Sequence, residues 1–511
     1  MAAIKVNKGK VYLIGAGPGD PDLITVRAVE CLKQADVVIY DFLAVPKLLQ
    51  YVREGAEIIY VGKKGGDHTL PQKKINELIA AKAKEGHAVA RLKGGDPFIF
   101  GRGGEEAEVL AAEGIPFEIV PGVTSPVAAP AYAGIPLTHR KYTSSVAFVT
   151  GHEDPTKEDS SIDWSKLATG VGTLVFLMGV KNLPGITENL IAAGRDPKTP
   201  VALVRWGTTP QQKTVVGTLD TIVEDVQAAG LKPPAIIVVG KVVKLRERLN
   251  WFEKMPLLGK TVVVTRARAQ ASELVDRLAG LGAECLECPT IKVVPPKDWS
   301  PLDSAIDNLG TYDWLVFTSV NGVSFFFERL YKKDKDVRAL KDIRTAAIGP
   351  ATAKRLRDFG FKSDIIPETY QAESIVEAFT KEPMKNKKVL LPRAKEARPI
   401  LPEELRKMGA VVDEIAAYET EQALENVDAL IKRLEEGSID LLTFTSSSTV
   451  RNFKVLLPPE RFESLIEGVT VASIGPITAD TARELGFKVD ITAKDYTIDG
   501  LCEAILQHYG L

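Results

Sequence analysis

The stretch RLKGGDPFIFGRGGEE, from Arg91 to Glu106, combines bare backbone with charged side chains. Five glycines fall within its sixteen residues. It lacks the Lys-Ser/Thr pair that ends a phosphate-binding loop, and its glycines do not follow the GxGxxG spacing of a dinucleotide site. Glycine lets a flat ligand approach the main chain closely, because no Cβ atom blocks the way. The stretch is therefore a candidate ligand-binding turn.

A second glycine-rich loop lies in VYLIGAGPGDPDLIT, between a predicted strand and a predicted helix. The sixth position of the dinucleotide motif is occupied by Asp20, and Pro18 has no N–H to offer a pyrophosphate. Asp41 ends the next predicted strand, as the ribose-binding acid of a Rossmann fold does. The faulty loop argues against a nicotinamide cofactor, and such an oxidoreductase stays as the less favoured alternative.

Several of these residues also have purely structural explanations. Asp41 would serve equally well as a cap for the turn after its strand. Glu105 and Glu106 would be ordinary first-turn acids, which the helix dipole favours. Cys285 and Cys288 in ECLEC imitate a metal-binding pair, but in a strand residues three apart face opposite sides. We interpret both as core thiols, and we expect no metal site.

Composition limits the class of protein. At 511 residues the chain is too long for one core, and two to four domains are expected. The net charge is -2, which argues against a nucleic-acid partner. No apolar run reaches membrane-spanning length, and the N-terminus does not have the form of a signal peptide. Four scattered cysteines are typical of a reducing cytoplasm, so we expect a cytoplasmic protein.

The elements that must position these residues follow an α/β pattern. Short β-branched runs alternate with helical patterns, and most runs end in Gly or Asp, as strands that feed ligand loops often do. Nine such strands are predicted before residue 255: KVYLIG, DVVIYD, EIIYVG, AVARL, FEIVPG, SVAFVTG, TLVFLMG, PVALVRWG and PAIIVVG. A short charged helix in LRERLNWFEK then precedes a boundary at about residue 255, and a new strand begins at Lys260.

The second half contains an internal repeat. DWLVFTSVNGV from Asp313 matches DLLTFTSSSTV at an offset of 127, and AAIGPATAKRLRDFGFKSDI from Ala346 matches ASIGPITADTARELGFKVDI at an offset of 126. KTVVVTRAR from Lys260 aligns with KKVLLPRAK, again at 127. The chain from about residue 259 is therefore two copies of one α/β unit, and two similar lobes provide a cleft for a ligand.

Through these motifs the chain resembles two enzyme families. Residues 9–252 resemble uroporphyrinogen-III C-methyltransferase, of the tetrapyrrole methylase superfamily. The repeated half resembles uroporphyrinogen-III synthase, through FTS and IGPxTA in both copies and AYET at Ala417. The methyltransferase motifs are VYLIGAGPGDPDLIT, DVVIYD, VGKKGG, RLKGGDPFIFGRGGEE, VPGVTSPVAAPAYAGIPLTHR, TLVFLMG, WGTTPQQ and PAIIVVGKVV.

The resemblance implies an α/β architecture of two parts, a two-lobed tetrapyrrole methylase fold and a two-lobed, internally duplicated synthase fold. It also implies a homodimer through the methyltransferase half. PTIKVVPP and AAYETEQ would be paired linkers between the synthase lobes. The implied boundaries are 1–252 for the methyltransferase, 253–258 for a linker and 259–511 for the synthase, with lobe one at 259–293 plus 421–511 and lobe two at 296–417.

The resemblance also implies the first chemistry and its residues. The methyltransferase would methylate uroporphyrinogen III twice with S-adenosyl-L-methionine (SAM), giving precorrin-2, the branch point towards sirohaem and cobalamin, and S-adenosyl-L-homocysteine. Asp41 would be the base and Lys63 the acid. Arg102, Glu105 and Arg140 would hold the substrate, whose carboxylates need arginine partners. The implied cofactor positions are Pro18, Gly94, Gly95, Asp96, Ile99, Thr124, Ser125, Met178 and Gly207.

The synthase half would cyclise hydroxymethylbilane to uroporphyrinogen III, inverting the last ring without a cofactor. Tyr418 matches a family tyrosine that assists departure of the hydroxyl group as a proton donor. The hydroxyl residues at the repeated strand ends and helix starts would bind carboxylates, together with free backbone N–H groups. They are Thr318, Ser319, Thr445, Ser446 and Thr478. The alternative for this half is a two-lobed tetrapyrrole-binding domain without activity.

Overall fold

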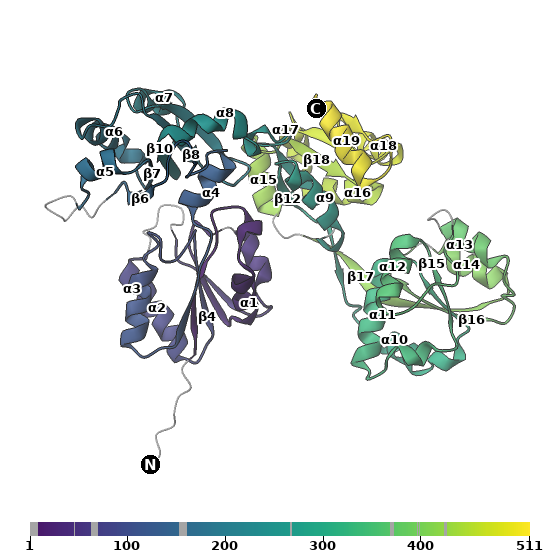
Figure 1. Ribbon diagram of the computed structural model, residues 1–511. Helices are drawn as coiled ribbons and strands as arrows, with labels where there is room; N and C mark the ends of the chain where they lie inside the picture. The colour runs from purple at the N-terminus through teal and green to yellow at the C-terminus, as the bar shows by residue number, and fades with distance from the viewer. Residues whose placement is uncertain are drawn as a thin grey trace, which may run out of the picture. The chain divides into compact units, whose positions relative to one another are not determined.

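The computed structural model confirms the predicted α/β class throughout the chain (Figure 1). It describes residues 9–44, 46–62, 70–152, 161–265, 268–367, 372–395, 397, 399–423 and 427–510. By its contacts the chain divides into two compact units, residues 1–260 with 278–284 and residues 261–277 with 285–511. Within the described ranges, no helix is both long and apolar enough to cross a membrane.

The first unit begins with a parallel five-stranded sheet in the order β3-β2-β4-β1-β5. Because all its strands run the same way, their carboxyl ends meet at one edge, where ligands bind in open α/β sheets. The strands are β1 (Val11–Gly15), β2 (Val37–Tyr40), β3 (Glu57–Tyr60), β4 (Val89–Lys93) and β5 (Phe117–Val120).

Helices cover both faces of this sheet, α1 (Val26–Gln34) on one side and α2 (Gln72–Lys84) with α3 (Gly103–Ala112) on the other (Figure 1). Alternate residues of each strand serve the two faces. In β4, Ala90 and Leu92 pack towards α1, whereas Val89 packs towards α2 and α3. Arg91 and Lys93 share the alternation of Val89, so two basic side chains lie on a buried face.

The second sheet of this unit is mixed, in the order β6-β7-β10-β8-β9. All nine predicted strands are present, and β9 was missed by the sequence analysis. This strand is a half-exposed edge strand, so its apolar alternation is weak. The strands are β6 (Val146–Thr150), β7 (Thr173–Leu177), β8 (Pro200–Arg205), β9 (Lys213–Thr218) and β10 (Ala235–Val239); the helices are α4 (Ser125–Tyr132), α5 (Trp164–Gly170), α6 (Leu183–Ala192), α7 (Ile222–Ala228) and α8 (Arg246–Leu249).

The second unit holds two further five-stranded sheets, β12-β11-β18-β19-β20 and β13-β17-β16-β14-β15. Their strands are β11 (Thr261–Val264), β12 (Glu284–Glu287), β13 (Ile291–Val294), β14 (Trp314–Phe317), β15 (Arg344–Ala347), β16 (Lys388–Ala394), β17 (Val411–Gln422), β18 (Leu441–Phe444), β19 (Thr470–Ser473) and β20 (Ile491–Thr492).

Helices flank these sheets, and short 3-10 turns join elements in both units. The helices are α9 (Arg268–Gly280), α10 (Ser300–Asp307), α11 (Val320–Lys332), α12 (Pro350–Asp358), α13 (Ala372–Phe379), α14 (Ile400–Lys407), α15 (Val427–Glu435), α16 (Ser447–Leu456), α17 (Phe462–Ile466), α18 (Pro476–Glu484) and α19 (Ile498–His508). The 3-10 turns are η1 (Pro21–Leu23), η2 (Pro46–Tyr51), η3 (Val180–Asn182), η4 (Lys241–Leu245), η5 (Phe252–Lys254), η6 (Leu309–Thr311), η7 (Val337–Leu340) and η8 (Pro459–Arg461).

The internal duplication is confirmed, and each sheet takes strands from both copies. The aligned sequences make β11 equivalent to β16, β14 to β18 and β15 to β19. One sheet contains the run β11-β18-β19 and the other the run β16-β14-β15, so a first-copy strand pairs with a second-copy strand in each. The copies therefore exchange strands, and neither copy forms a sheet from its own residues alone.

Equivalent hydrogen bonds support this correspondence. The Asp440 carboxylate accepts the backbone N–H of Thr261 at 2.8 Å, and the Asp313 carboxylate accepts that of Lys388 at 2.8 Å. Each acid thus holds the first backbone amide of the neighbouring strand. The shared geometry explains why both copies keep an aspartate before their FTS strand.

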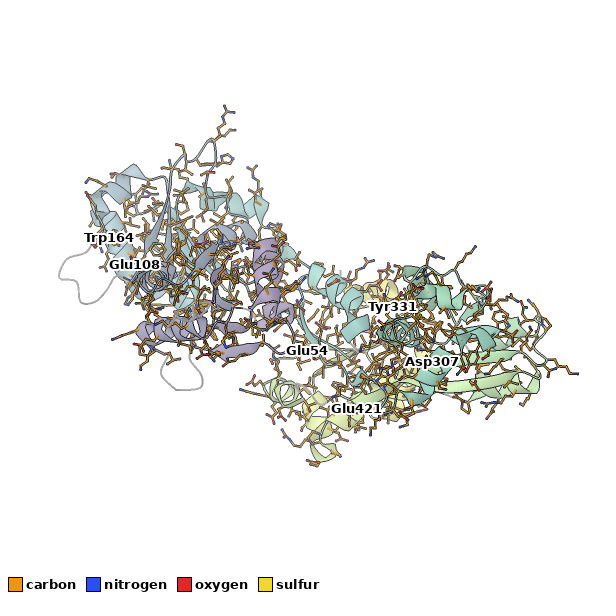
Figure 2. The ribbon with its side chains drawn as sticks, turned by 90° about the horizontal axis from the view of Figure 1, so that it is seen from below. Glu54, Glu108, Trp164, Asp307, Tyr331 and Glu421 are labelled. Carbon is orange, nitrogen blue, oxygen red and sulfur yellow. The ribbon has the colours of Figure 1, made fainter. Side chains whose placement is uncertain are left out.

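The two predicted linker segments lie against each other. β13 pairs antiparallel with the last part of β17, from Glu419 to Gln422. Lys292 and Glu421 add an ion pair of 3.6 Å across these strands, and Figure 2 labels Glu421 on β17. The segments are therefore strands of a ribbon rather than loose connections.

Candidate functional sites

Three loops meet at the carboxyl edge of the first sheet, after β1, β4 and β5. Gly17 and Gly95 exchange backbone hydrogen bonds of 3.2 and 2.7 Å. A Cβ atom at Gly15 would lie 2.5 Å from the Cα of Gly122 and 2.7 Å from the carbonyl oxygen of Gly95. Backbone therefore packs on backbone here, and glycine is required because no side chain fits between the loops.

Three of the five glycines in the Arg91–Glu106 stretch are required by packing, whereas a Cβ atom at Gly104 would meet nothing within 4 Å. Cβ atoms at Gly101 and Gly103 would lie 2.7 and 2.4 Å from the carbonyl oxygen of Pro97, so these two glycines allow the loop to close on itself. A Cβ atom at Gly94 would lie 2.5 Å from the Cβ of Leu43. These three positions are explained by packing within the chain.

Gly95 is different, because a Cβ atom would fit there without a clash. Its φ is +68°, in the left-handed region that favours glycine. A Cβ atom there would meet nothing closer than 3.8 Å, and the atoms at that distance belong to Thr124 and Ser125 at the start of α4. Three of the predicted cofactor residues, Gly95, Thr124 and Ser125, thus lie beside one another.

The remaining predicted cofactor residues lie on neighbouring loops. The Asp96 carboxylate accepts the backbone N–H groups of Phe98 at 2.8 Å and Gly122 at 3.0 Å, so it ties the loop after β4 to the loop after β5. Ile99 is partly exposed. Met178 follows β7 with a φ of +58° and is exposed.

Asp20 joins the first glycine loop to the second sheet's loops. Its N–H donates to Thr208 Oγ1 at 3.0 Å, and its carboxylate accepts the Tyr132 hydroxyl at 2.7 Å. Burial and this hydrogen bond raise the pKa of Tyr132. The residue that spoils the dinucleotide motif therefore has a structural role of its own. It brings Pro18, in the loop just before it, near the turn that holds Gly207.

Gly207 lies in a tight turn after β8. A Cβ atom there would lie 2.3 Å from the Cβ of Ala129 on α4, so packing requires glycine. Its neighbours Trp206 and Thr208 have φ values of 48° and 74°. The ring of Trp206 meets that of Phe42, beside Asp41, edge-on at 6.1 Å. The loops after β2 and β8 thus approach each other.

Asp41 is held by a buried arginine that the sequence analysis missed. Arg91 Nη2 donates to Asp41 Oδ2 at 2.9 Å, and Arg91 Nε donates to Glu106 Oε1 at 3.2 Å. Lys93 Nζ reaches the same Glu106 oxygen at 2.8 Å. Arg91, Lys93 and Glu106 are 2%, 4% and 1% exposed. Burial, followed by the nearby Arg91 charge, lowers the pKa of Lys93.

The predicted substrate residues do not all lie together: Arg102 and Glu105 are in contact, but Arg140 lies on a different turn. Arg102 and Glu105 form a bidentate ion pair of 2.6 and 2.8 Å at the start of α3, beside a hollow of about 340 Å³ between α2 and α3. This pairing raises the pKa of Arg102 and lowers that of Glu105. Arg140 is exposed on the turn between His139 and Thr143. Lys63 lies outside the described residues.

In the second unit, two predicted synthase residues are in contact. The hydroxyls of Tyr418 on β17 and Ser319 before α11 are 2.9 Å apart, and Ser319 Oγ also accepts the N–H of Gly322 at 2.9 Å. Tyr418 is 8% exposed, and its ring stacks on Phe325 at 5.7 Å. Thr318, half-buried, links β14 to Ser319. The phenol is therefore held in one orientation at the carboxyl edge of its sheet.

A buried arginine, also missed from the sequence, lies near this tyrosine. Arg393 on β16 is 4% exposed, and its Nη1 is 3.4 Å from Glu414 Oε1. Burial lowers the pKa of Arg393, while Glu414 and Tyr418 act in the opposite direction. In both units the missed residues are charged side chains inside apolar strands. Such charges are a signal in themselves, because a strand in the middle of a parallel sheet is buried on both faces.

The other three predicted synthase residues belong to the other sheet. Ser446 caps α16, where its Oγ accepts the N–H of Thr449 at 3.2 Å, and Thr445 precedes it after β18. Thr478 is 6% exposed in the first turn of α18. The structure thus places these hydroxyls on β12-β11-β18-β19-β20, and Tyr418 with Ser319 on β13-β17-β16-β14-β15.

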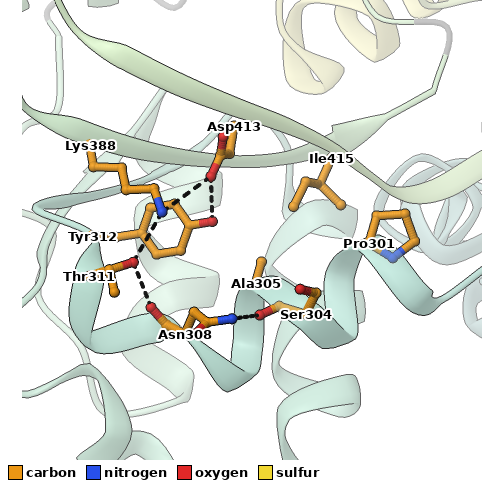
Figure 3. A pocket seen from close by; sticks show the side chains of 9 residues that line it. All are labelled: Pro301, Ser304, Ala305, Asn308, Thr311, Tyr312, Lys388, Asp413 and Ile415. Atoms are coloured by element: carbon orange, nitrogen blue, oxygen red, sulfur yellow. Dashed lines mark hydrogen bonds and ion pairs between the residues drawn. The ribbon is translucent and has the colours of Figure 1, made fainter.

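A separate hollow of about 320 Å³ lies at the amino edge of the sheet that carries Tyr418 (Figure 3). There the Tyr312 hydroxyl donates to Asp413 at 2.6 Å, and Lys388 Nζ donates to Thr311 Oγ1 at 3.1 Å. Burial and the Asp413 bond raise the pKa of Tyr312. These groups pair with one another across the strands, which is a structural role.

The cysteines and acids give no metal centre in the described ranges, where no group of three or more potential ligands occurs. Cys288 is buried, and burial raises the pKa of its thiol to about 11. Cys285 is only partly buried, on β12.

Comparisons with known proteins find one family in each half of the chain. Residues 10–223 match the family Tetrapyrrole (Corrin/Porphyrin) Methylases, and residues 272–503 match Uroporphyrinogen-III synthase HemD. The "Porphyrin biosynthesis protein HemD" of Ruminiclostridium josui is 40% identical over 499 residues, which are 98% of this chain and 98% of that protein.

Two further relatives match the first half. The uroporphyrinogen-III C-methyltransferase of Priestia megaterium is 55% identical over 235 residues, 46% of this chain and 98% of that protein. The solved structure of the Thermus thermophilus uroporphyrin-III C-methyl transferase complexed with S-adenyl homocysteine is 40% identical, covers 46% of this chain and 100% of its own, and has a TM-score of 0.40. With a relative that matches over nearly its whole length, the chain belongs to the HemD porphyrin biosynthesis family, as a bifunctional tetrapyrrole biosynthesis enzyme in which a methyltransferase precedes a uroporphyrinogen-III synthase.

Proposed function

We propose that the chain catalyses two consecutive reactions. The second half cyclises hydroxymethylbilane to uroporphyrinogen III with inversion of the last ring, and the first half methylates this product twice with SAM, giving precorrin-2 for sirohaem or cobalamin synthesis. We assign residues 1–252 to methylation, 253–258 to a linker and 259–511 to cyclisation. The observation that carries the proposal is the presence of both families, in this order, in one chain.

The bare backbone at Gly95, beside Thr124 and Ser125, is a suitable place for SAM. A flat adenosyl group needs bare backbone on one side, and Gly95 provides it next to Thr124 and Ser125, which a Cβ atom there would approach to 3.8 Å. Pro18, Gly94, Asp96, Ile99, Met178 and Gly207 would complete the site. When bound, SAM supplies a methyl group activated by its sulfonium, and the chain's task is to place the acceptor carbon in line with it.

The acceptor is a polycarboxylate, and exposed arginines can bind it. The Arg102–Glu105 pair is about half exposed, and such pairs contribute little to stability, about 0–1 kcal/mol. Arg102 can therefore exchange Glu105 for a substrate carboxylate, and Arg140 is open to solvent. Asp41 would accept the proton that the methylated ring carbon loses, and Lys63 would act as the acid.

In the synthase half, Tyr418 would donate its proton to the departing hydroxyl of the bilane, which leaves as water. Ser319 fixes the phenol through the 2.9 Å contact, and its own position is fixed by Gly322. Thr318, Thr445, Ser446 and Thr478 would bind side-chain carboxylates of the substrate. Two lobes with hydroxyls at their strand ends suit a long, flexible substrate that must be folded before it closes.

The enzyme as a whole is proposed to be a cytoplasmic homodimer, joined through the methyltransferase half. Sedimentation of the purified protein measures the mass of the assembly. A second measurement on residues 1–252 alone tells whether this half carries the contact.

The decisive test of function supplies the whole protein with hydroxymethylbilane, with and without SAM, and measures products by mass and isomer. We expect uroporphyrinogen III without SAM, and with SAM a product heavier by two methyl groups. Bilane also closes spontaneously to the isomer without inversion. That isomer alone would reject the synthase assignment and favour a non-catalytic binding domain, and uroporphyrinogen III that stays unmethylated would reject the methyltransferase assignment.

A further inference from the structure

Beneath Asp41 lies a cluster of buried charges that neither proposed reaction uses. The Arg91 guanidinium is fixed at three of its nitrogen atoms: Nη2 to Asp41 at 2.9 Å, Nε to Glu106 at 3.2 Å and Nη1 to the carbonyl oxygen of Leu92 at 3.1 Å. Arg91 comes from β4 and Glu106 from the first turn of α3. The cluster thus connects a central strand and a helix to the loop that carries Asp41.

The two carboxylate oxygens of Glu106 differ in their hydrogen bonds. Its Oε1 accepts three donors, from Arg91 at 3.2 Å, Lys93 at 2.8 Å and Gln72 at 3.0 Å. Its Oε2 is buried and has no hydrogen-bond partner. Buried charges are costly, and a buried polar atom left unsatisfied in a native structure calls for an explanation. Packing alone does not require this arrangement, because an apolar residue would fill the same position more favourably.

The alternative anchor of Asp41 is weak. Its other oxygen accepts the N–H of Leu43 at 3.2 Å, within the same loop. The neighbouring Phe42 and Leu43 lie against Trp206 and Gly94 but stay 62% and 53% exposed, so their side chains anchor the loop only weakly. The hydrogen bond to Arg91 is therefore what ties the carboxylate to the rigid sheet.

We propose that Glu106 and Arg91 are positioning residues for methyl transfer: Glu106 orients Arg91, and Arg91 holds the Asp41 carboxylate where it meets the acceptor carbon. Lys93 completes the balance, because two cations and two carboxylates then leave the buried cluster neutral. This inference rests on the proposed function, and specifically on Asp41 as the proton acceptor. Asp41 acts on the tetrapyrrole and not on SAM, so the proposal predicts no change in SAM affinity.

The experiment compares full-length Glu106→Gln, Arg91→Lys and the double variant Glu106→Gln/Lys93→Met with wild type. The amide that replaces the Glu106 carboxylate can still accept a hydrogen bond, but it leaves the cluster with one positive charge in excess. The double variant restores neutrality. Single-turnover methylation of supplied uroporphyrinogen III is measured together with the KM for it and with SAM affinity by calorimetry, whose stoichiometry counts the folded molecules.

A matched control is Glu118→Gln. Glu118 forms ion pairs with Lys10 at 2.6 Å and Arg27 at 2.8 Å in the same sheet, but on its outer strand β5 and away from the carboxyl-edge cluster. Its loss removes charge pairs from the same unit without touching Asp41. The control should lower the melting temperature while the methylation rate per folded molecule stays the same.

We expect Glu106→Gln and Arg91→Lys to lower the single-turnover rate about 10- to 100-fold, because a displacement of about 1 Å at a reacting group has an effect of that size. SAM affinity should stay within about twofold of wild type, and the double variant should recover most of the rate. Unchanged rates in Glu106→Gln and Arg91→Lys would overturn the proposal, as would a rate that falls only in parallel with SAM binding. Full turnover by Asp41→Asn would instead reject the role of Asp41, and an inactive wild type would reject the methyltransferase assignment.

Discussion

At the scale of single residues, Gly95 gives the most direct test of the proposed SAM-binding turn. Gly95→Val should abolish SAM binding, because a branched side chain would cover the bare backbone proposed to hold the ligand and would have to adopt a φ of +68°. The left-handed conformation alone costs about 1–2 kcal/mol for such a residue. Calorimetry measures the affinity. Gly104→Ala is the control, since a Cβ atom there meets nothing within 4 Å, and equal SAM affinity in folded Gly95→Val would contradict the assignment.

Asp41 separates binding from chemistry. Asp41→Asn should keep SAM affinity and lose methyl transfer by about 10²-fold or more, because an amide cannot take up the proton. The carbonyl oxygen of the new amide can still accept the Arg91 hydrogen bond, so the loop should stay in place. Single-turnover methylation and calorimetry measure the two properties, and a normal rate would remove Asp41 from the mechanism.

The role of Tyr418 can be tested against Tyr312, a second buried tyrosine at the opposite edge of the same sheet. Tyr418→Phe should slow bilane cyclisation about 10²–10⁴-fold, the usual effect of lost proton donation, and should shift the isomer ratio towards the spontaneous product. Tyr312→Phe also removes a buried hydroxyl, one that donates to Asp413 at the opposite edge, and should leave rate and isomer ratio unchanged. Equal behaviour of the two variants would reduce Tyr418 to a packing residue.

The sequence predicts the residues proposed to act on the ligands, but it does not predict the residues that hold them in place. Gly95, Asp41 and Tyr418 carry local signals, namely a glycine turn and strand ends. For Arg91 and Lys93 the local signal is only a charge inside an apolar strand, and their roles with Glu106 depend on one face of β4 meeting the first turn of α3. That meeting is a tertiary contact between residues up to 15 positions apart, and the alternation of β4 shows only that the charges are buried.

At the scale of elements, the two copies should fail in the same way. Asp313→Ala and Asp440→Ala each remove the acceptor for a backbone N–H of the adjacent strand, which typically costs about 1–3 kcal/mol. Urea unfolding of residues 259–511 measures the loss. Asp480→Ala, at an exposed ion pair with Arg483, is the control. A loss from only one of the two aspartates would show that the copies have ceased to be equivalent.

Glu118 links β5 to β1 and α1 and makes one contribution to stability depend on pH. Hydrogen bonds from Arg27, then from Lys10, lower the pKa of Glu118 from 4.5 to about 2. Its side chain is 27% exposed, so solvent screening limits the effect to about 1 kcal/mol. Because the folded-state pKa is depressed, the stabilisation is complete above about pH 4.5 and is lost as the pH falls towards 2.

Thermal melts of wild type and Glu118→Gln should therefore differ at about pH 6 and converge as the pH approaches 2. A difference that stays constant across this range would mean that the ion pairs contribute nothing.

The strands themselves were easier to predict than the pairing between them. The nine strands of the first half were found because each is a compact β-branched run with a glycine or acid behind it. β9 was missed, since it is an edge strand whose residues are mostly half-buried. The repeat revealed which strands are equivalent, but pairing follows from hydrogen bonds between chain segments that no local pattern records.

The whole molecule should behave as two enzymes on one chain. Tyr418→Phe should leave methylation unchanged when uroporphyrinogen III is supplied, and Asp41→Asn should leave the bilane isomer ratio unchanged. Each contact that carries a proposed role lies within one of the two compact units. Both rates are measured on each variant, and a loss of both activities in either folded variant would contradict independence.

The strand exchange between the copies imposes an order on the newborn chain. The hydroxyl of Thr443 on β18 donates to the carbonyl oxygen of Val263 on β11, 180 residues earlier. At about 5–20 residues per second, a ribosome needs about 10–35 s to make that partner. The sheet containing β14 and β16 can close meanwhile, since its parallel strands are complete at Gln422. Translation speed over residues 264–444 thus sets how long β11 waits with an unpaired edge, open to capture by another chain or by a chaperone.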